Sequence, residues 1–535
     1  MEKESFDRTG LTSEVVTLFG GARYDLYRYR KYPDVRLVFA PDQATAAFGG
    51  DPDNFEYPRY CLDICVFRIY DHGRPLASRD YLKWNAAGPA KDELVFVAGH
   101  PGSSERLETV DEIAYQRDAR LPLAVAELER IETALAQFRA TSPEHARQAA
   151  ESAASIANSR KAYRGFLKGL QENGALLQKK YLDEYAFRQD LARQAALDAY
   201  AQIHAAIEAD RANYAAFQAY ERFAGRSDLF NLARTLVRAA AERDKPNGER
   251  LPPYRESALP GLEFRLFSGR PFYPDLEAFF LADGLQYAVA QFGANDPLVR
   301  KLLAGKTPQA RAAELVRGSR LEDIAYRRKL YAGGGRALAA GADPMLAFAT
   351  LMDPAARAAR AIDDRDNAVR RRAYATIYQA RVALGRAPAY PDATGTLRLA
   401  CGTVTGCEAD GKFLEPFTDF RGLFAHAAAH ASQPPFAVAP AWLAAKPALD
   451  LATPLNFIST ADILGGNSGS PVVNARGEFV GVIFDGNAPS LAGRYFYDPA
   501  ANRAIAVDSA GILESLRKVY HAAPLAQELT SGHAP

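Results

Sequence analysis

The sequence lacks several features that would assign a protein to a class at once. Its 535 residues include only four cysteines, and no CxxC, HExxH or EF-hand pattern occurs, so neither a metal nor another cofactor is predicted. The formal net charge is +1, which gives no electrostatic reason to expect nucleic acid or an anionic membrane as a partner. No apolar run approaches the ~20 residues that a membrane-spanning helix needs. An ordinary globular composition remains.

The beginning of the chain has no apolar stretch. Residues 1–8 read MEKESFDR, and no hydrophobic segment of the kind found in a signal peptide follows them. Two interpretations stay open here. The protein works in the cytosol, or its natural start lies upstream of residue 1.

The hydrophobic patterning divides the chain into three parts. The first, residues 1–104, has short runs rich in β-branched and aromatic residues at 35–39 and 64–70, with turn signals between them. The second, residues 105–385, is rich in Ala, Leu, Arg and Glu at helical spacing, and helices are predicted at 110–140, 146–174, 178–224 and 273–291.

The third part, residues 386–535, returns to β patterning and closes with a helix at 509–519. A chain of this length is too long for one core. We therefore predict an α+β protein with domains at 1–104, 105–385 and 386–535, in which a helical domain separates two β regions.

One Gly-rich segment carries a strong chemical signal. Residues 465–471 read GGNSGSP, and two strand-like runs follow them directly. A serine set among glycines can sit on a tight turn with its hydroxyl exposed, and the amides of Gly466 and Ser468 can converge on a developing oxyanion. Ser468 is therefore the candidate nucleophile. The alternative is a plain Gly/Ser turn of a β domain.

A second signal is an acidic residue inside an apolar run. Asp63 lies in the segment CLDICVFR, which is predicted to be a strand. A buried carboxylate without a partner is costly, so Asp63 needs one, such as an imidazole N–H. The alternative for Asp63 is a structural ion pair or a position at a sheet edge.

Together these segments resemble the S46 peptidase family, the bacterial dipeptidyl peptidases of types 7 and 11. The similar stretches are GGDPDNF and YPRY before Asp63, VAGHPGS at 97–103, YPDAT at 390–394, and ILGGNSGSP followed by FDGN at 484–487. The resemblance runs through both β regions. It implies a chymotrypsin-like double β-barrel with a large inserted α-helical domain, and a serine peptidase that releases dipeptides from free N-termini of oligopeptides.

The resemblance also implies roles for individual residues. Ser468 attacks the scissile carbonyl, Asp63 orients a histidine, and Gly466 contributes an oxyanion amide. It also implies that the residues that bind the α-ammonium and the first side chains of the substrate are Asn54, Phe55, Asn158, Asp485 and Gly486. The alternatives are turn positions for Asn54 and Asp485, and a solvated helix position for Asn158. Since the acid-specific branch of the family has arginine where this chain has Gly486, a hydrophobic residue is expected at P1, the substrate position before the cleaved bond.

The sequence departs from the family at one essential point. The family's histidine precedes the aspartate by well over a hundred residues, whereas none of the eight histidines of this chain precedes Asp63. Three explanations compete: an N-terminal truncation that removes the first part of the β-barrel, a pseudoenzyme that binds peptides without cleaving them, or a recruited base such as His100. By resemblance alone we further expect a periplasmic or secreted homodimer.

Overall fold

The computed structural model describes residues 1–190, 194–409 and 411–532. Its contacts divide the chain into two compact units. We call one the helical unit (Met1–Glu4, Ala126–Ile156 and Arg193–Ile377) and the other the sheet unit (Ser5–Val125, Ala157–Ala192 and Tyr378–Pro535). The three predicted domains remain a prediction, since this division follows contacts rather than the order of the chain.

The main element of the sheet unit is an eight-stranded sheet. Its strands follow the order β11-β12-β15-β14-β13-β7-β8, and β6 pairs in parallel with β14. The bounds are β6 Lys83–Trp84, β7 Leu94–Gly99, β8 Arg398–Thr403, β11 Phe417–Asp419, β12 Pro454–Ser459, β13 Pro471–Asn474, β14 Glu478–Gly486 and β15 Ala504–Asp508.

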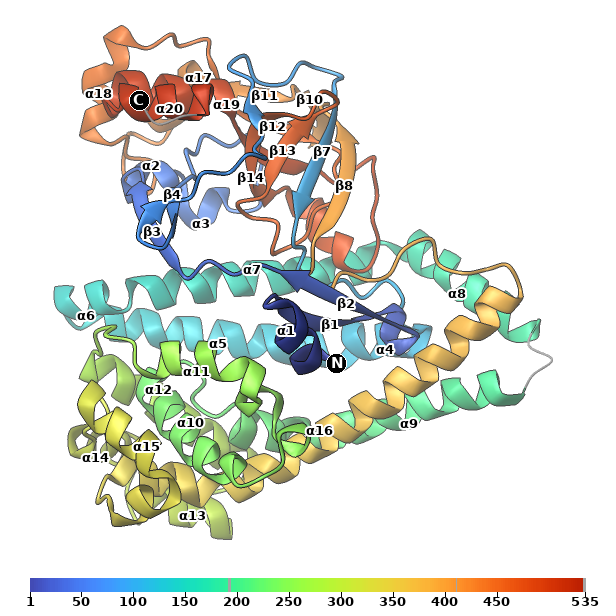
Figure 1. Ribbon diagram of the computed structural model, residues 1–535, viewed down its shortest axis with the longest axis vertical. Coiled ribbons are helices and arrows are strands. Elements are labelled where there is room, and N and C mark those ends of the chain that lie inside the picture. The colour runs from blue at the N-terminus through green and yellow to red at the C-terminus, as the bar shows by residue number, and fades with distance from the viewer. Residues whose placement is uncertain (191–193, 410, 533–535) are drawn as a thin grey trace. The chain divides into compact units, whose positions relative to one another are not determined.

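One strand of this sheet comes from the first hundred residues of the chain. β7 lies between β13 and β8, and Figure 1 shows the blue strand beside orange and gold ones. Val97 pairs with Val472, and both are completely buried. The sheet that follows the Gly-rich segment is thus completed by a strand from the opposite end of the sequence.

The predicted chymotrypsin-like double β-barrel, with the first part of one barrel missing, is not confirmed, because the sheets of the described residues are not closed barrels. Val404, the residue after β8, forms a single isolated bridge with Ser459 of β12. One bridge is not a ladder of strand pairs, so the large sheet does not close. The remaining strands form smaller sheets. They are β1 (Thr12–Leu18) with β2 (Arg23–Tyr29), β9 (Cys407–Ala409) with β10 (Lys412–Leu414), and β3 (Asp34–Phe39) with β4 (Val66–Asp71) and β5 (Arg74–Pro75).

The sheet formed by β3, β4 and β5 presents an apolar face to solvent. Leu37 and Phe67 oppose each other across the strands and are 61% and 54% exposed. Val35 and Ile69, the next pair on the same face, are also exposed. Strand β4 begins at Val66, because its pairing with β3 starts there, so Asp63 precedes the strand instead of lying inside it as predicted.

Helices flank these sheets in the sheet unit, and one extended core supports them. That core joins Phe48 and Leu62 to Trp442, Ile505 and Leu516. The helices that lie wholly in this unit are α2 Gln43–Ala46, α3 Gly50–Asp53, α4 Val110–Tyr115, α8 Gly174–Gln189, α17 Phe420–Ala429, α18 Pro440–Ala445, α19 Ser509–Glu514 and α20 Ala523–Ser531.

The helical unit is built around an aliphatic and aromatic core. Phe223, Phe230 and Phe348 are at most 1% exposed and contact one another at its centre. Its helices are α6 Pro143–Gln148, α9 Gln194–Ala216, α10 Asp228–Arg243, α11 Leu259–Leu266, α12 Pro274–Phe292, α13 Pro297–Leu303, α14 Pro308–Gly318 and α15 Ile324–Ala340.

Four helices have residues in both units: α1 Glu2–Thr9, α5 Leu121–Ala140, α7 Ala150–Glu172 and α16 Pro344–Ala383. The helical character predicted for residues 110–140 and 273–291 is confirmed by α4, α5 and α12. Within the part of the chain that the structure describes, none of the helices is both long and apolar enough to span a membrane.

Candidate functional site

The Gly-rich segment forms a tight turn between Leu464 and β13. Gly466 has a φ of 108°, and a Cβ there would come within 2.6 Å of the carbonyl oxygen of His100. The amide of Gly102 donates to the carbonyl of Gly465 over 2.8 Å. The loop that follows β7 therefore fixes this turn from one side, and only glycine fits at position 466.

The hydrogen bonds of the turn leave two amides unused. Asn467 N donates to Leu464 O and Gly469 N donates to Ile483 O, whereas the amides of Gly466 and Ser468 donate to no acceptor among the described residues. Ser468 is exposed, and its Oγ lies 3.4 Å from the carbonyl oxygen of Phe484. Two free amides beside an accessible hydroxyl are the arrangement that an oxyanion hole requires.

Asp485, in the last part of β14, links the turn that presents Ser468 to the GGDPDNF segment. Its buried carboxylate accepts from the amide of Phe55 over 3.0 Å and from that of Gly486 over 2.8 Å, and it forms an ion pair with Arg59. Burial raises the pKa of the Asp485 carboxyl, and the charge of Arg59 opposes this rise. Phe55 has a φ of 58°, so the bond from its amide holds a backbone conformation that non-glycine residues rarely adopt.

Arg59 was not singled out in the sequence analysis. It lies in YPRY, is 6% exposed, and belongs to the loop that leads to Asp63. A buried arginine needs an acidic partner, so an arginine next to apolar residues is the signal that could have indicated a buried ion pair here. The spacing of residues in the sequence does not reveal this partner, because Asp485 lies 426 residues after Arg59.

The structure brings together two of the predicted substrate-binding residues. Asn54 Nδ2 donates to Asn158 Oδ1 over 2.9 Å, and Asn158 lies on the part of α7 that belongs to the sheet unit. Two neighbours reinforce this contact: Arg160 pairs with Asp51 at 3.0 Å, and Lys161 donates to the Asp51 carbonyl over 2.9 Å. The bond leaves Asn54 Oδ1 without a donor among the described residues, available to accept from an ammonium group.

Asp63 is placed near this group of residues but has no partner. The residue is exposed, and among the residues that the structure describes none forms a hydrogen bond or ion pair with its carboxylate. Partial desolvation raises the pKa of Asp63, with Arg59 lowering it and Asp485 raising it further. The imidazole that the predicted triad requires is therefore not found beside Asp63.

The histidine that does reach the GGDPDNF segment is His426, on α17. Its Nε2 lies 3.1 Å from Asp53 Oδ2, and its ring packs beside Tyr60 at a centroid distance of 5.3 Å. Asp53 also sits against Gly49, where a Cβ would come within 2.1 Å of the carboxylate. His426 thus helps to position the residue before Asn54. No local spacing in the sequence indicates this contact, because the helix of His426 lies 373 residues after Asp53.

His100, the suggested substitute base, contributes its backbone to the site. Its carbonyl oxygen borders Gly466, and its side chain is exposed without a hydrogen bond to any described residue. Gly486 is buried, and a Cβ at this position would come within 2.4 Å of Ser490 Oγ. A larger residue at 486 would therefore displace Ser490.

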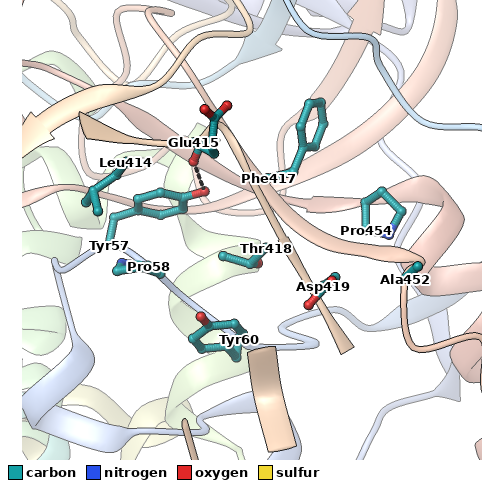
Figure 2. Close-up of a pocket in the computed structure, with 10 residues that line it drawn as sticks. All are labelled: Tyr57, Pro58, Tyr60, Leu414, Glu415, Phe417, Thr418, Asp419, Ala452 and Pro454. Carbon is teal, nitrogen blue, oxygen red and sulfur yellow. Dashed lines mark hydrogen bonds between the residues drawn. The ribbon is translucent and has the colours of Figure 1, made fainter. Parts of the chain in front are cut away.

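A pocket of about 310 Å³ lies beside the YPRY segment. Figure 2 shows the rings of Tyr57 and Tyr60 at its wall, and the Tyr57 hydroxyl donates to the carbonyl of Glu415 over 2.9 Å. Thr418, another wall residue, donates to the carbonyl of Arg59 over 2.8 Å. The pocket is connected through Arg59 to Asp485, although neither Ser468 nor Asp63 lines it.

Comparison with known proteins identifies the family. A model of the family described as Peptidase S46 matches residues 1–531. The chain belongs to the peptidase S46 family. Among curated relatives, it is 29% identical to the Asp/Glu-specific dipeptidyl-peptidase of Shewanella putrefaciens, over 96% of this chain and 77% of that protein. It is 26% identical to the dipeptidyl-peptidase 7 of Porphyromonas endodontalis, over 95% of this chain and 64% of that one.

Solved structures support the S46 fold. The crystal structure of Porphyromonas endodontalis DPP11 in complex with the dipeptide Arg-Glu superposes with a TM-score of 0.79 at 21% identity. The match covers 98% of this chain and 79% of that one. The mixed helix and sheet architecture is therefore that of an S46 peptidase, whereas closed β-barrels are not present in the described part of this chain.

Proposed function

We propose that this S46 chain is a serine dipeptidyl aminopeptidase that acts on oligopeptides with a free N-terminus. Ser468 Oγ forms the bond to the carbonyl carbon of the second residue, and the amides of Gly466 and Ser468 bind the oxyanion. The amide C–N bond then breaks, the shortened peptide leaves with a proton, and water releases the dipeptide from Ser468. The family resemblance gives Asp63 the role of orienting the base that carries these protons. None of the described residues is an imidazole partner of Asp63, so the assay below has to identify this base.

One observation carries the proposal. Ser468 Oγ approaches the carbonyl of Phe484, and the next residue, Asp485, is bonded to the amide of Phe55. The nucleophile is therefore joined within two residues of β14 to the segment that presents Asn54. This proximity supports cleavage close to a recognised α-ammonium, since the ammonium and the scissile carbonyl of a dipeptide unit are only a few bonds apart.

For the P1 side chain we propose a hydrophobic preference. Gly486 offers no charge, and the crowding around it disfavours a larger residue. The names of the relatives do not favour this choice, because the Shewanella protein is Asp/Glu-specific while other relatives are named dipeptidyl-peptidase 7. The choice therefore depends on Gly486 alone.

A second candidate function is binding of peptide N-termini without cleavage. The observation that favours it is Asp63, whose carboxylate has no imidazole partner among the described residues. In this alternative Asn54, Asn158 and Asp485 keep their roles in binding. Ser468 then lacks the base that activates it.

The test is an assay of this chain with dipeptidyl-coumarin substrates that carry Leu, Phe, Asp or Glu at P1. Ser468→Ala is the matched control. We expect turnover of the Leu and Phe substrates and its loss in the control. A preference for Asp or Glu would overturn the P1 assignment, and His100→Ala identifies the base if turnover occurs.

If the Ser468 protein and its alanine variant are both inactive, binding separates the candidates. Calorimetry with the peptide Phe-Leu-Ala and its N-acetylated form measures recognition of the ammonium. Tighter binding of the free peptide that weakens in Asn54→Ala supports the binding function, and equal binding contradicts both functions. A homodimer and a periplasmic location are further proposals, which light scattering and cell fractionation test.

A further inference from the structure

The helical unit contains a pocket of about 500 Å³ that the proposed peptidase chemistry does not use. Helices α10, α11, α15 and α16 contribute to its walls, together with the 3₁₀ turn at Pro252–Tyr254. Six arginines and two carboxylates are among the lining residues. The arginines are Arg234, Arg238, Arg265, Arg270, Arg327 and Arg360.

Half of these arginines are neutralised by carboxylates. Arg238 pairs with Glu221 and Asp353, Arg360 lies 3.2 Å from Glu221, and Arg270 lies 2.7 Å from a glutamate. Glu221, which is 8% exposed, is therefore already shared between two guanidinium groups. The lining offers no spare buried carboxylate to the remaining arginines.

Arg327 is the most unusual of the remaining three. It is 1% exposed, its Nη2 donates to the carbonyl of Ser268 over 2.9 Å, and its Nε is buried without a partner. Asp323, the residue directly before α15, instead accepts from the amide of Ala325. In the described part of the chain no carboxylate forms an ion pair with Arg327. A buried guanidinium stays charged. Apart from the nearby charge of Asp323, the described residues give Arg327 a neutral carbonyl as its partner.

Arg234 and Arg265 are in a similar position. Arg234 donates to the carbonyl of Glu221 and, over 3.0 Å, to Asn231 Oδ1, both of which are uncharged groups. Burial lowers the pKa of the Arg234 guanidinium, and the charge of Arg238 adds to this effect. Arg265 is exposed and forms no ion pair with a described residue.

Apolar side chains line the same pocket. Phe264, on α11, is 83% exposed, and Tyr254, Leu262 and Phe272 are also in the lining. Phe264 thus leaves an exposed aromatic ring beside the arginines, which the apolar part of a ligand can cover. The pocket therefore combines an exposed aromatic ring and three arginines that form no ion pair with a described carboxylate.

We propose that this pocket binds a small ligand in which an oxyanion, a carboxylate or a phosphate, is attached to an aromatic or apolar group. Arg327, Arg234 and Arg265 bind the oxyanion, since guanidinium forks match the geometry of both groups. Phe264 and Phe272 contact the apolar part. The site belongs entirely to the helical unit, so its failure and a failure of the proposed peptidase site are separate results.

The test is calorimetry on the whole chain with phenyl phosphate, N-acetylphenylalanine and the neutral N-acetylphenylalanine amide. The acetyl group blocks the ammonium that the proposed peptidase site reads. We expect both anions to bind and to raise the unfolding temperature, and the amide to bind at least about tenfold more weakly. The anion that binds more tightly shows whether the pocket prefers a phosphate or a carboxylate. Equal binding of the amide, or no binding at millimolar concentration, would overturn the proposal.

Variants locate the binding. Arg327→Met removes the charge at similar length, and we expect about a tenfold loss of affinity or more. Arg328→Gln is the matched control, because Arg328 is the adjacent residue of α15 and does not line the pocket. If Arg327→Met fails to fold, Arg234→Gln and Arg265→Gln carry the test. Unchanged affinity in both of these, or an equal loss in the Arg328 control, would contradict the assignment.

Discussion

The two main sheets of the sheet unit differ sharply in how they are packed. In the eight-stranded sheet, Val95, Val97 and Val472 are completely buried. In the sheet that follows Asp63, the paired side chains of Leu37 and Phe67 are more than half exposed. The eight-stranded sheet beside Ser468 thus has a buried apolar core, whereas the sheet that follows Asp63 has an exposed apolar face. Asp63, which has no partner among the described residues, directly precedes the sheet whose apolar face is exposed.

The ion pairs of the two sheets give the largest contrast. Asp485→Asn leaves Arg59 charged in an interior where both side chains are under 10% exposed, so we expect a loss of about 3–5 kcal/mol in the free energy of unfolding. The matched change Asp34→Asn removes the partner of exposed Arg36 and should cost about 0–1 kcal/mol. Urea denaturation measures both. Equal losses would mean that the pair on β3 is buried in solution.

Apolar truncation provides a second contrast. Val472→Ala removes buried methyl groups opposite Val97, and we expect a loss of about 1–3 kcal/mol. Leu37→Ala removes a side chain that is 61% exposed and should change the stability by no more than about 0.5 kcal/mol. A large loss in Leu37→Ala would show that another surface covers β3.

Buried carboxyl groups of the large sheet should make stability depend on pH. Burial raises the pKa of Asp508, at the end of β15, to about 8, well above the ordinary range of an aspartate. The folded state then keeps a proton that the unfolded state releases, so stability is highest below pH ~4 and falls as the pH rises toward ~8. Asp508→Asn should flatten the stability profile across this window.

The control for this prediction is Asp80→Asn, since the Asp80 side chain is 88% exposed. In this variant, the denaturation midpoint should change with pH between pH 4 and 8 as steeply as it does in the parent protein. If the midpoint of Asp508→Asn changed with pH as steeply as that of the parent protein, the Asp508 carboxyl would not be the source of the pH dependence of stability.

The smallest expected effect concerns solubility. Leu37→Lys places a charge on the exposed face of the sheet formed by β3, β4 and β5, where it meets no buried group. We expect stability to change by no more than about 0.5 kcal/mol, with less aggregation seen by light scattering. Increased aggregation or a loss of folding would contradict an exposed face.

The local parts of the site could be predicted from the sequence, and the long-range parts could not. The turn at Gly466 follows from adjacent glycines, and the pairing of Asn54 with Asn158 brings together two residues chosen by family resemblance. The bond between Asp485 and Phe55 joins two predicted residues, but the ion pair with Arg59 was missed. A single sequence contains no signal for which distant charges meet.

Strand placement shows the same limit. Residues 94–99 lie in the region that is predicted to be β, yet nothing in the sequence of this region indicates pairing with β13 instead of the earlier strands. Asp63 was assigned to a strand because its neighbours are apolar. The strand begins three residues later, where pairing with β3 starts, and that start depends on a partner outside the local pattern.

The position of β7 has a consequence for how the protein is made. A ribosome completes β7 early, but its neighbours β8 and β13 emerge only after the whole helical unit has been synthesised. Until then Val95 and Val97 have no sheet to join, and contacts between such distant segments form slowly. The sheet beside Ser468 is therefore among the last structures to form, and in a nascent chain the turn that presents Ser468 has no organised support until synthesis is nearly complete.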